Sequence, residues 1–210
     1  MILGIDTSIG TAVALVDPAG RALAARESAD TRGHAEAIGG LIAGVLADAG
    51  VGPAAVEAVA AGMGPGPFTG LRVGIAAARA FATGRGVPVL PVASHEAVAA
   101  ELAERGETGR VVIVSDARRR EHYWTLLDLG TPTPAALPVL VKGPGLAALD
   151  DLDAVIGEGA RRVEPHRVDA AALARLALRR RAAGEPTGPA APLYLREPDL
   201  TPSRGPKRVS

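Results

Sequence analysis

Three short apolar segments open the chain, at residues 2–7, 11–17 and 21–28, and each ends in polar or turn-forming residues. The run Asp17-Pro18-Ala19-Gly20 is a turn signal between the second and the third. Short apolar runs bounded in this way predict strands joined by tight turns. We therefore expect an antiparallel meander at the start of the fold, unlike the opening of a doubly wound sheet.

Two longer segments then carry apolar residues around most of a helical circumference. Residues 34–48 have no charged or polar side chain between Glu36 and Asp48, and residues 69–83 have only a narrow polar stripe. Such helices are expected to be buried on both sides. One face belongs on the sheet, and the other lies either in the core or against a partner protein. Glycine costs about 1 kcal/mol relative to alanine inside a helix, so the Gly40–Gly44 step predicts close approach of another helix.

The remaining pattern predicts a second, looser set of strands and helices. We expect strands at 87–92, 111–114, 121–129, 139–142 and 153–157, and a helix at 94–104 with Ser94 as its N-cap. Residues 168–183 form an amphipathic pattern with Arg175, Arg179 and Arg180 on the outside. Both halves begin with an apolar strand that ends in an aspartate, Asp6 and Asp116. This echo suggests a duplicated α/β fold of the ribonuclease H or actin type, with mixed sheets flanked by helices.

A glycine- and proline-rich turn, residues 62–74, joins a predicted strand to the second long helix. The phosphate-loop pattern fails because Leu71 and Arg72 stand where Lys and Ser/Thr are required, and the dinucleotide pattern fails because Thr69 replaces its third glycine. Thr69 is a suitable N-cap. Free N–H groups at this helix start could hold an anion, with Asp6, Thr69, Gly70 and Arg72 as candidate anion-binding residues. The alternative is a rigid capped turn without a ligand, and Asp6 is then a turn-capping aspartate.

Composition removes several function classes. The chain has 210 residues, 23 basic against 23 acidic side chains, and no cysteine. Thiol catalysis and cysteine-ligated zinc are excluded, and no global field favours nucleic acid. The first residues predict a strand instead of a signal peptide, and the longest uncharged helical run is too short to span a bilayer. We expect a cytoplasmic protein. The run Arg118-Arg119-Arg120 could contact a phosphate backbone, or be a solvated run of charge.

Candidate catalytic residues are few. The four histidines, His34, His95, His122 and His166, are not spaced as a helical metal pair, because Ile38 stands four residues after His34. Asp6 and Asp116 could form a magnesium-assisted phosphotransfer pair. Three hypotheses therefore stay open: a scaffold subunit, an actin/hexokinase-like nucleotide-binding phosphotransferase, and a glycoprotease-like metallopeptidase.

The motifs resemble the TsaB (YeaZ) family of bacterial subunits for tRNA threonylcarbamoyladenosine (t6A) synthesis. The resemblance rests on Gly4-Ile-Asp-Thr-Ser8, on the stretch Gly64-Pro-Gly-Pro-Phe-Thr-Gly-Leu-Arg-Val-Gly74, on Asp116-Ala-Arg118 before Tyr123-Trp124, and on Tyr194-Leu-Arg196. It covers most of the chain, and the second of these motifs is highly specific.

The resemblance implies a two-lobed actin/hexokinase-like (ribonuclease H-like) fold, with an N-terminal lobe at residues 1–95, a smaller lobe at 96–196 and a C-terminal tail at 197–210. It implies a non-catalytic subunit, without cofactor or metal, that binds and activates TsaD for threonylcarbamoyl transfer to adenosine 37 of tRNA. TsaE is a further implied partner, a homodimer is implied when the chain is alone, and tRNA is contacted indirectly. The implied partner-binding residues on the two helices are His34, Ala37, Gly40, Leu41, Gly44, Arg72, Ile75, Ala76, Arg79 and Ala80.

Overall fold

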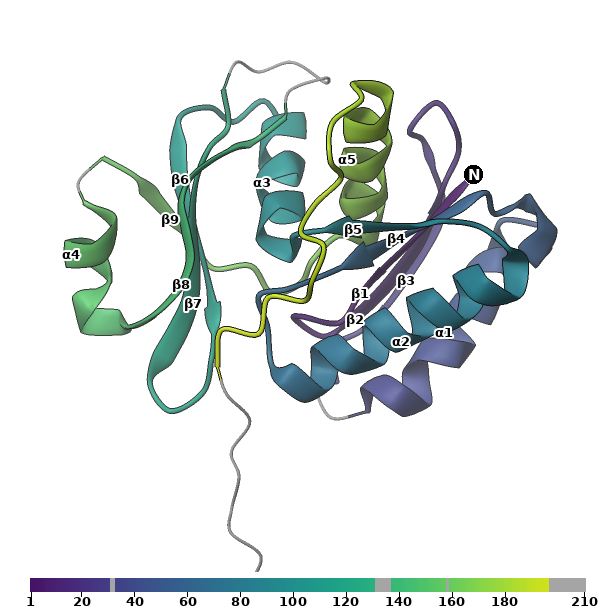
Figure 1. Ribbon diagram of the computed structural model, residues 1–210, viewed down its shortest axis with the longest axis horizontal. Coiled ribbons are helices and arrows are strands. Elements are labelled where there is room, and N and C mark those ends of the chain that lie inside the picture. Colours follow the sequence, from purple (N-terminus) through teal and green to yellow (C-terminus); the bar gives the residue numbers. More distant parts are fainter. Residues whose placement is uncertain (31–32, 131–136, 158, 197–210) are drawn as a thin grey trace, which may run out of the picture.

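The chain forms two β-sheets. Helices lie on the outer side of each sheet and between the two sheets (Figure 1). The computed structural model describes residues 1–30, 33–130, 137–157 and 159–196. The first sheet contains β1 (Ile2–Asp6), β2 (Thr11–Val16), β3 (Ala22–Ser28), β4 (Ala58–Gly62) and β5 (Val89–Val92). The second contains β6 (Arg110–Asp116), β7 (Glu121–Asp128), β8 (Val139–Ala148) and β9 (Arg161–Val163). The helices are α1 (His34–Asp48), α2 (Phe68–Arg85), α3 (Ser94–Glu104), α4 (Leu152–Ile156) and α5 (Ala170–Ala182), with 3₁₀ turns at Pro53–Ala55 and Leu149–Asp151.

The first sheet has the strand order β3-β2-β1-β4-β5. β1 pairs antiparallel with β2, and β2 antiparallel with β3, so the predicted meander is confirmed. β4 and β5 then add in parallel on the other side of β1. An antiparallel meander continued by parallel strands is the ribonuclease H-like arrangement, and the predicted fold class of mixed sheets flanked by helices is confirmed.

The strands β1, β2 and β4 of the first sheet are buried on both faces, because they send alternate apolar side chains into two different clusters. Leu3 and Ile5 of β1 lie in the cluster that α1 and α2 cover. Ile2 lies in the other cluster, together with residues of α3 and α5. Figure 1 shows the resulting layers, with α1 and α2 on one side of the first sheet and α3 and α5 between the two sheets.

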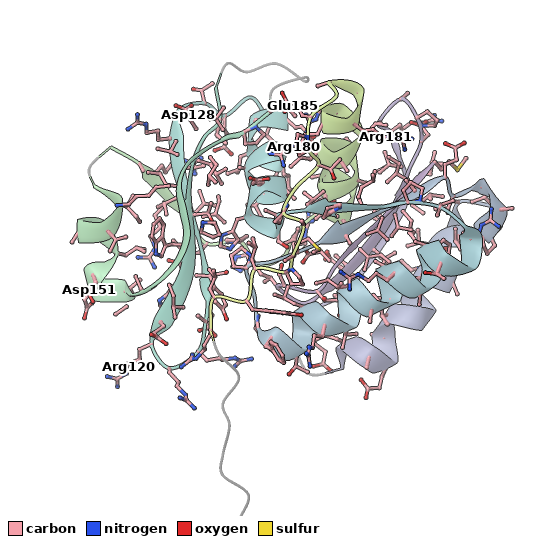
Figure 2. The ribbon with its side chains drawn as sticks, viewed as in Figure 1. Arg120, Asp128, Asp151, Arg180, Arg181 and Glu185 are labelled. Carbon is pink, nitrogen blue, oxygen red and sulfur yellow. The ribbon has the colours of Figure 1, made fainter. Side chains whose placement is uncertain are left out.

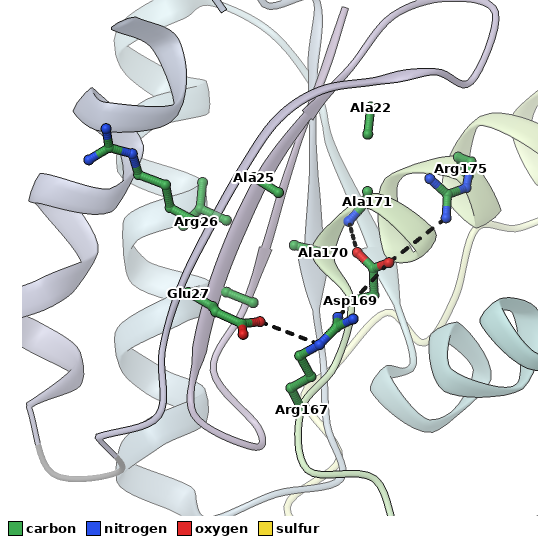
Figure 3. Close-up of a pocket in the computed structure, with 11 residues that line it drawn as sticks. Ala22, Ala25, Arg26, Glu27, Arg167, Asp169, Ala170, Ala171 and Arg175 are labelled. Atoms are coloured by element: carbon green, nitrogen blue, oxygen red, sulfur yellow. Dashed lines mark hydrogen bonds and ion pairs between the residues drawn. The ribbon is translucent and has the colours of Figure 1, made fainter. Parts of the chain in front are cut away.

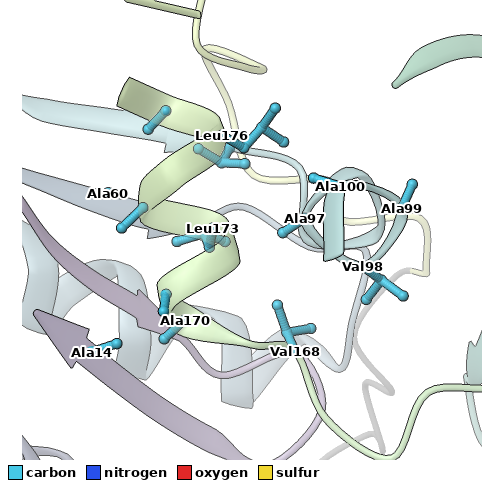
Figure 4. Close-up of a cluster of buried hydrophobic side chains, with 14 of the residues drawn as sticks. Ala14, Ala60, Ala97, Val98, Ala99, Ala100, Val168, Ala170, Leu173 and Leu176 are labelled. Atoms are coloured by element: carbon cyan, nitrogen blue, oxygen red, sulfur yellow. The ribbon is translucent and has the colours of Figure 1, made fainter. Parts of the chain in front are cut away.

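α3 and α5 form an alanine-rich middle layer. Leu173 and Leu176 of α5 pack beside Ala97 and Ala100 of α3 (Figure 4). The small side chains let α5 approach the sheet closely, and at Gly4 an added Cβ would lie 2.1 Å from the carbonyl oxygen of Ala170. Glycine at this position of β1 is therefore required by packing.

The prediction that Arg175, Arg179 and Arg180 lie on the outside of α5 was wrong. Arg175 and Arg179 both bind Glu104 of α3, at 2.6 Å and 2.9 Å. Arg180 is buried and pairs with Glu96 at 2.6 Å. The sequence pattern of α5 alone could not show that α3 supplies carboxylates on the facing side.

Two predictions in the second half also failed. Residues 153–157 were expected to be a strand, but Leu152–Ile156 is the helix α4. Leu152, Val155 and Ile156 are spaced as on one helical face, and they pack with Trp124 behind the second sheet. β9 was not predicted, and β8 extends to Ala148, beyond the expected strand end at Lys142.

The predicted lobe boundaries remain a prediction. The expected boundary after residue 95 falls inside α3, and α5, which follows the second sheet in sequence, packs on the first. The predicted tail at 197–210 lies outside the described residues.

Candidate functional site

Asp6, at the end of β1, is buried, and both of its carboxylate oxygens accept hydrogen bonds. Its Oδ1 accepts from the Ser8 backbone N–H at 2.8 Å and from the Ser8 hydroxyl at 2.6 Å. Its Oδ2 accepts from the Ser94 hydroxyl at 2.5 Å. An added Cβ on Gly62 would lie 1.9 Å from Oδ2, so the end of β4 also closes against this carboxyl group. Asp6 therefore holds together the ends of β1 and β4 and the start of α3.

Burial raises the pKa of the Asp6 carboxyl group above its ordinary value, and the hydrogen bonds from Ser8 and Ser94 oppose that rise. Asp116, the other predicted member of a phosphotransfer pair, is exposed, and its Oδ1 accepts from the Arg118 backbone N–H at 2.7 Å. Both aspartates thus cap the turns that follow their own strands. Among the described residues, no group of three or more acidic or histidine side chains is arranged to hold a metal ion.

The glycine- and proline-rich turn is an interior structure. Residues 62–66 are buried, the Gly64 backbone N–H donates to the Ser94 hydroxyl at 3.1 Å, and the Gly64 carbonyl accepts from the Ser94 N–H at 2.7 Å. The Thr7 hydroxyl donates to the Gly70 carbonyl at 2.7 Å, which ties the start of α2 to the end of β1. Backbone groups of the glycine- and proline-rich turn are therefore used in hydrogen bonds within the protein and do not form an open anion-binding site.

The two predicted N-caps were wrong. α2 begins at Phe68 after Pro67, and Thr69 lies exposed inside its first turn. α3 begins at Ser94 itself, whose hydroxyl is used on Asp6 instead of on its own helix. The N-cap position of α2 is Pro67, two residues before Thr69, and that of α3 is Ala93, one residue before Ser94.

A cavity of about 320 Å³ lies where the starts of α1 and α2 meet the end of β6. Thr69 and Gly70, two of the four candidate anion-binding residues, line it, together with Asp116 and Arg118. Asp6 and Arg72 do not line it. The predicted anion-binding residues therefore do not form one site: Thr69 and Gly70 line this cavity, and Asp6 and Arg72 lie elsewhere.

Arg72 lies at the other side of the start of α2, over an aromatic ring. Its guanidinium carbon is 4.1 Å from the centroid of the Phe68 ring, within the range of a cation–π contact. The Phe68 ring in turn lies 4.8 Å from the ring of Tyr194, in the segment that follows α5. This stack connects two of the sequence motifs, and it leaves Arg72 exposed.

The outer surface of α1 and α2 contains most of the predicted partner-binding residues. Gly40, Arg72, Ala76, Arg79 and Ala80 are exposed, and Ala37, Leu41 and Gly44 are partly exposed. We call these eight residues the helix-pair surface. His34 and Ile75 are buried, and His34 Nδ1 is 2.7 Å from the Thr11 hydroxyl. These two side chains face the interior because they lie on the sheet side of their helices.

The expectation that α1 is buried on both sides is not met within this chain. Around Gly39 and Gly40 an added Cβ would have nothing within 4 Å, whereas at Gly44 it would meet the guanidinium group of Arg26. Arg26 is held there by Asp48, at 2.6 Å. The predicted close approach at the Gly40–Gly44 step is therefore not made by another helix of this chain.

His95 is a buried polar residue whose position the sequence analysis did not predict. Its Nδ1 is 2.8 Å from the Thr125 hydroxyl and its Nε2 is 2.9 Å from the Ser115 hydroxyl, so it joins α3 to β7 and β6. Burial lowers the pKa of the imidazole from 6.5 to about 3. The signal was the pair Ser94-His95 directly after a buried strand, which had been considered only as a helix start.

A second cavity, of about 390 Å³, lies between β2, β3 and the start of α5 (Figure 3). Its charges are paired with one another. Arg167 lies 3.4 Å from Glu27, and Asp169 caps α5 by accepting from the Ala171 N–H at 2.8 Å. The pairing leaves little net charge for a ligand, and no function was predicted here.

Comparisons with known proteins match this chain to a transferase family model and to TsaB and YeaZ proteins. Residues 27–142 match the family "TsaD: tRNA N6-adenosine threonylcarbamoyltransferase". An uncharacterized protein of Mycobacterium tuberculosis is 37% identical over 185 residues, which are 86% of this chain and 83% of that protein. The "tRNA threonylcarbamoyladenosine biosynthesis protein TsaB" of Haemophilus influenzae is 39% identical over 94 residues, 45% of this chain and 40% of that protein.

Among solved structures, "YeaZ from Pseudomonas aeruginosa" has a TM-score of 0.75 and 27% sequence identity, covering 92% of this chain and 99% of that chain. The likeness therefore extends over both sheets. Among the described residues, no helix has the length and apolar character needed to cross a membrane.

Proposed function

The chain belongs to the TsaB (YeaZ) family, and we propose that it is a non-catalytic subunit that binds a TsaD protein through the helix-pair surface. Bound in this way, it would activate TsaD for threonylcarbamoyl transfer to an adenosine of tRNA. TsaE is a further proposed partner, and a second copy of this chain is the proposed occupant of the same surface when TsaD is absent.

One observation carries the proposal: the glycines at the exposed side of α1 have no packing reason within this chain. Gly39 and Gly40 each cost about 1 kcal/mol relative to alanine in a helix, and an added Cβ at either would meet nothing within 4 Å. Ala76 and Ala80 of α2 are also exposed. A surface of small residues on two neighbouring helices lets the backbone of a partner helix come close, which offsets this cost in the complex.

The geometry of Asp6 supports a role without chemistry. Both carboxylate oxygens already accept hydrogen bonds from Ser8 and Ser94. A metal ligand or a phosphotransfer group would have to give up those bonds, and the end of β1 would then lose its contact with the start of α3.

The experiment is a binding titration of purified TsaD with the wild-type chain and with Ala76→Glu. An unpaired neutral polar group in a desolvated interface costs about 1–3 kcal/mol, and the charge of a glutamate costs more, so the Kd should rise at least about fivefold. Stimulation of TsaD in a reconstituted tRNA assay should fall in parallel.

The matched control is Ala154→Glu, another exposed helical alanine, on α4 behind the second sheet. It adds the same charge and should bind TsaD like the wild type. Equal affinity of Ala76→Glu and wild type would refute the assignment of the surface. Failure of the wild-type chain to bind or stimulate TsaD would refute the function.

A further inference from the structure

The turn between β6 and β7 consists of three consecutive arginines in the left-handed backbone region. Arg118, Arg119 and Arg120 have φ values of 68°, 54° and 62°. This region is unfavourable for residues with a Cβ, and where it is populated the usual residues are glycine, asparagine and aspartate. None of these three positions has such a residue. Strained backbone of this kind persists only where surrounding contacts impose it.

Contacts from both flanks impose the turn. The Arg118 N–H donates to Asp116 Oδ1 at 2.7 Å, the Ala117 N–H donates to the Glu121 carbonyl at 2.9 Å, and the Glu121 N–H donates to the Arg118 carbonyl at 3.0 Å. From the segment after α5, Arg196 Nη1 donates to the Ala117 carbonyl at 2.6 Å, and Arg196 Nη2 lies 3.2 Å from the Glu121 carboxylate. The loop is thus fixed before any ligand arrives.

The side chains of the fixed turn are accessible to solvent. All three arginines are exposed, and Figure 2 shows Arg120 projecting from the tip of the hairpin. Within the described part of the chain, Arg118 and Arg120 form no ion pair with a carboxylate, unlike the arginines of α5. The nearby carboxylates, Asp116 and Glu121, already bind the Arg118 N–H and Arg196. Even with Arg119 left out, the three guanidinium groups of Arg118, Arg120 and Arg196 outnumber these two carboxylates, so the turn is positive in a chain of net charge zero.

We propose that the Arg118–Arg120 turn binds the phosphate backbone of RNA. Arginine presents a planar fork of donors that matches phosphate oxygens. The backbone at the tip of the turn already has a fixed conformation, so it loses little conformational entropy on binding. The arginine side chains are exposed, so a phosphate group can reach them. The choice of tRNA as the RNA rests on the proposed function. Arg118 also lines the cavity beside Thr69 at the start of α2, so RNA on this turn would lie next to the helix-pair surface.

RNA is favoured over an anionic membrane by what surrounds the arginines. Membrane-surface segments combine basic residues with apolar side chains that enter the lipid. The turn has no such side chain: Ala117 is buried, and the flanking residues Asp116 and Glu121 are acidic. Backbone contact by guanidinium groups is independent of base sequence, so the turn would position tRNA without selecting it.

The test is fluorescence anisotropy of labelled, unmodified tRNA with the full chain between 0.05 and 0.2 M KCl, comparing wild type with Arg118→Gly/Arg120→Gly. Glycine accepts positive φ without strain, so this variant removes two charges and retains the turn. Each lost phosphate contact reduces the salt slope by about 0.7. We expect binding about 25-fold weaker at 0.1 M salt and a slope smaller by about 1.4.

The charge-matched control is Arg110→Ala/Arg181→Ala. Both residues are exposed, and Arg110 starts β6 at the end opposite the turn, about 20 Å away at the usual rise per residue of a strand. The control should bind tRNA like the wild type. Equal affinity of wild type and the glycine variant, equal loss in the control, or no wild-type binding at 0.05 M KCl would each overturn the proposal. Displacement of tRNA by phosphatidylserine vesicles but not by unlabelled tRNA would also overturn it and favour a membrane.

Affinity for TsaD, measured on the same proteins, separates this inference from the proposed function. The glycine variant should bind TsaD like the wild type while losing tRNA. Wild-type binding of tRNA through the turn without any binding of TsaD would support the turn and remove the proposed function alone.

Discussion

Acidification should destabilise the fold through His95. The buried imidazole has its pKa lowered from 6.5 to about 3 and contacts the hydroxyls of Thr125 and Ser115. Between these two pH values the unfolded chain takes up a proton that the folded chain does not. Stability therefore rises with pH in this window and is lost as the pH falls from about 6.5 toward 3. At pH 5 the loss relative to pH 7 is about 2 kcal/mol, since each pKa unit corresponds to about 1.4 kcal/mol.

The assay is urea unfolding at pH 7, 6, 5 and 4.5, followed by the fluorescence of Trp124, the single and buried tryptophan. The wild type is compared with His95→Gln, in which an amide can still donate and accept between the two hydroxyls but does not titrate. The variant should be less stable at pH 7, and the gap to wild type should shrink by about 2 kcal/mol at pH 5.

Subtracting the two curves removes the other titrating groups. Asp6 acts in the opposite sense: its raised pKa means that the folded chain binds a proton more readily, so this group adds stability as the pH falls. It is present in both proteins and cancels. The free energy of unfolding of the two proteins is compared as a function of pH. If the difference between them stays constant from pH 7 to pH 4.5, His95 titrates normally in the fold, and the buried arrangement is refuted.

Three single substitutions give further predictions about the stability of the fold. Ser94→Ala leaves Asp6 Oδ2 and the Gly64 N–H without their partner and should cost about 1–3 kcal/mol in urea unfolding; no change would mean that water replaces the hydroxyl. Gly62→Ala, whose Cβ would lie 1.9 Å from Asp6 Oδ2, should cost at least about 1–3 kcal/mol. At Gly39 an added Cβ would have nothing within 4 Å, so Gly39→Ala should instead stabilise the isolated chain by up to about 1 kcal/mol. Thermal unfolding should therefore show opposite shifts for Gly62→Ala and Gly39→Ala.

The elements that sequence patterns predicted well are those whose neighbours are local or apolar. The meander followed from three apolar runs and one turn, and α1 and α2 followed from continuous helical runs. Residues 153–157 were taken for a strand because they contain only the short apolar run Ala-Val-Ile. The helical face of α4 includes Leu152, and it becomes recognisable only once Trp124 is known to lie beneath it. Periodicity over five residues does not distinguish the two structures.

The site was harder to predict because its residues meet through tertiary contacts. The glycine- and proline-rich turn lacks the lysine of the phosphate-loop pattern. The reason for its composition is the fit of Gly62 against Asp6 and of Gly70 and Gly74 against Thr7, which needs coordinates. Ser94 lies 88 positions from Asp6 in sequence, so nothing local could link them.

Association of this chain with TsaD is the central proposal, and a mass measurement in solution tests it. The chain of 21.2 kDa should co-elute with purified TsaD in size-exclusion chromatography with light scattering, as a species whose mass contains both proteins, with and without ATP. Ala76→Glu should elute apart from TsaD under the same conditions. Two separate peaks at the masses of the free wild-type chain and free TsaD, at micromolar concentrations of each, would contradict the account.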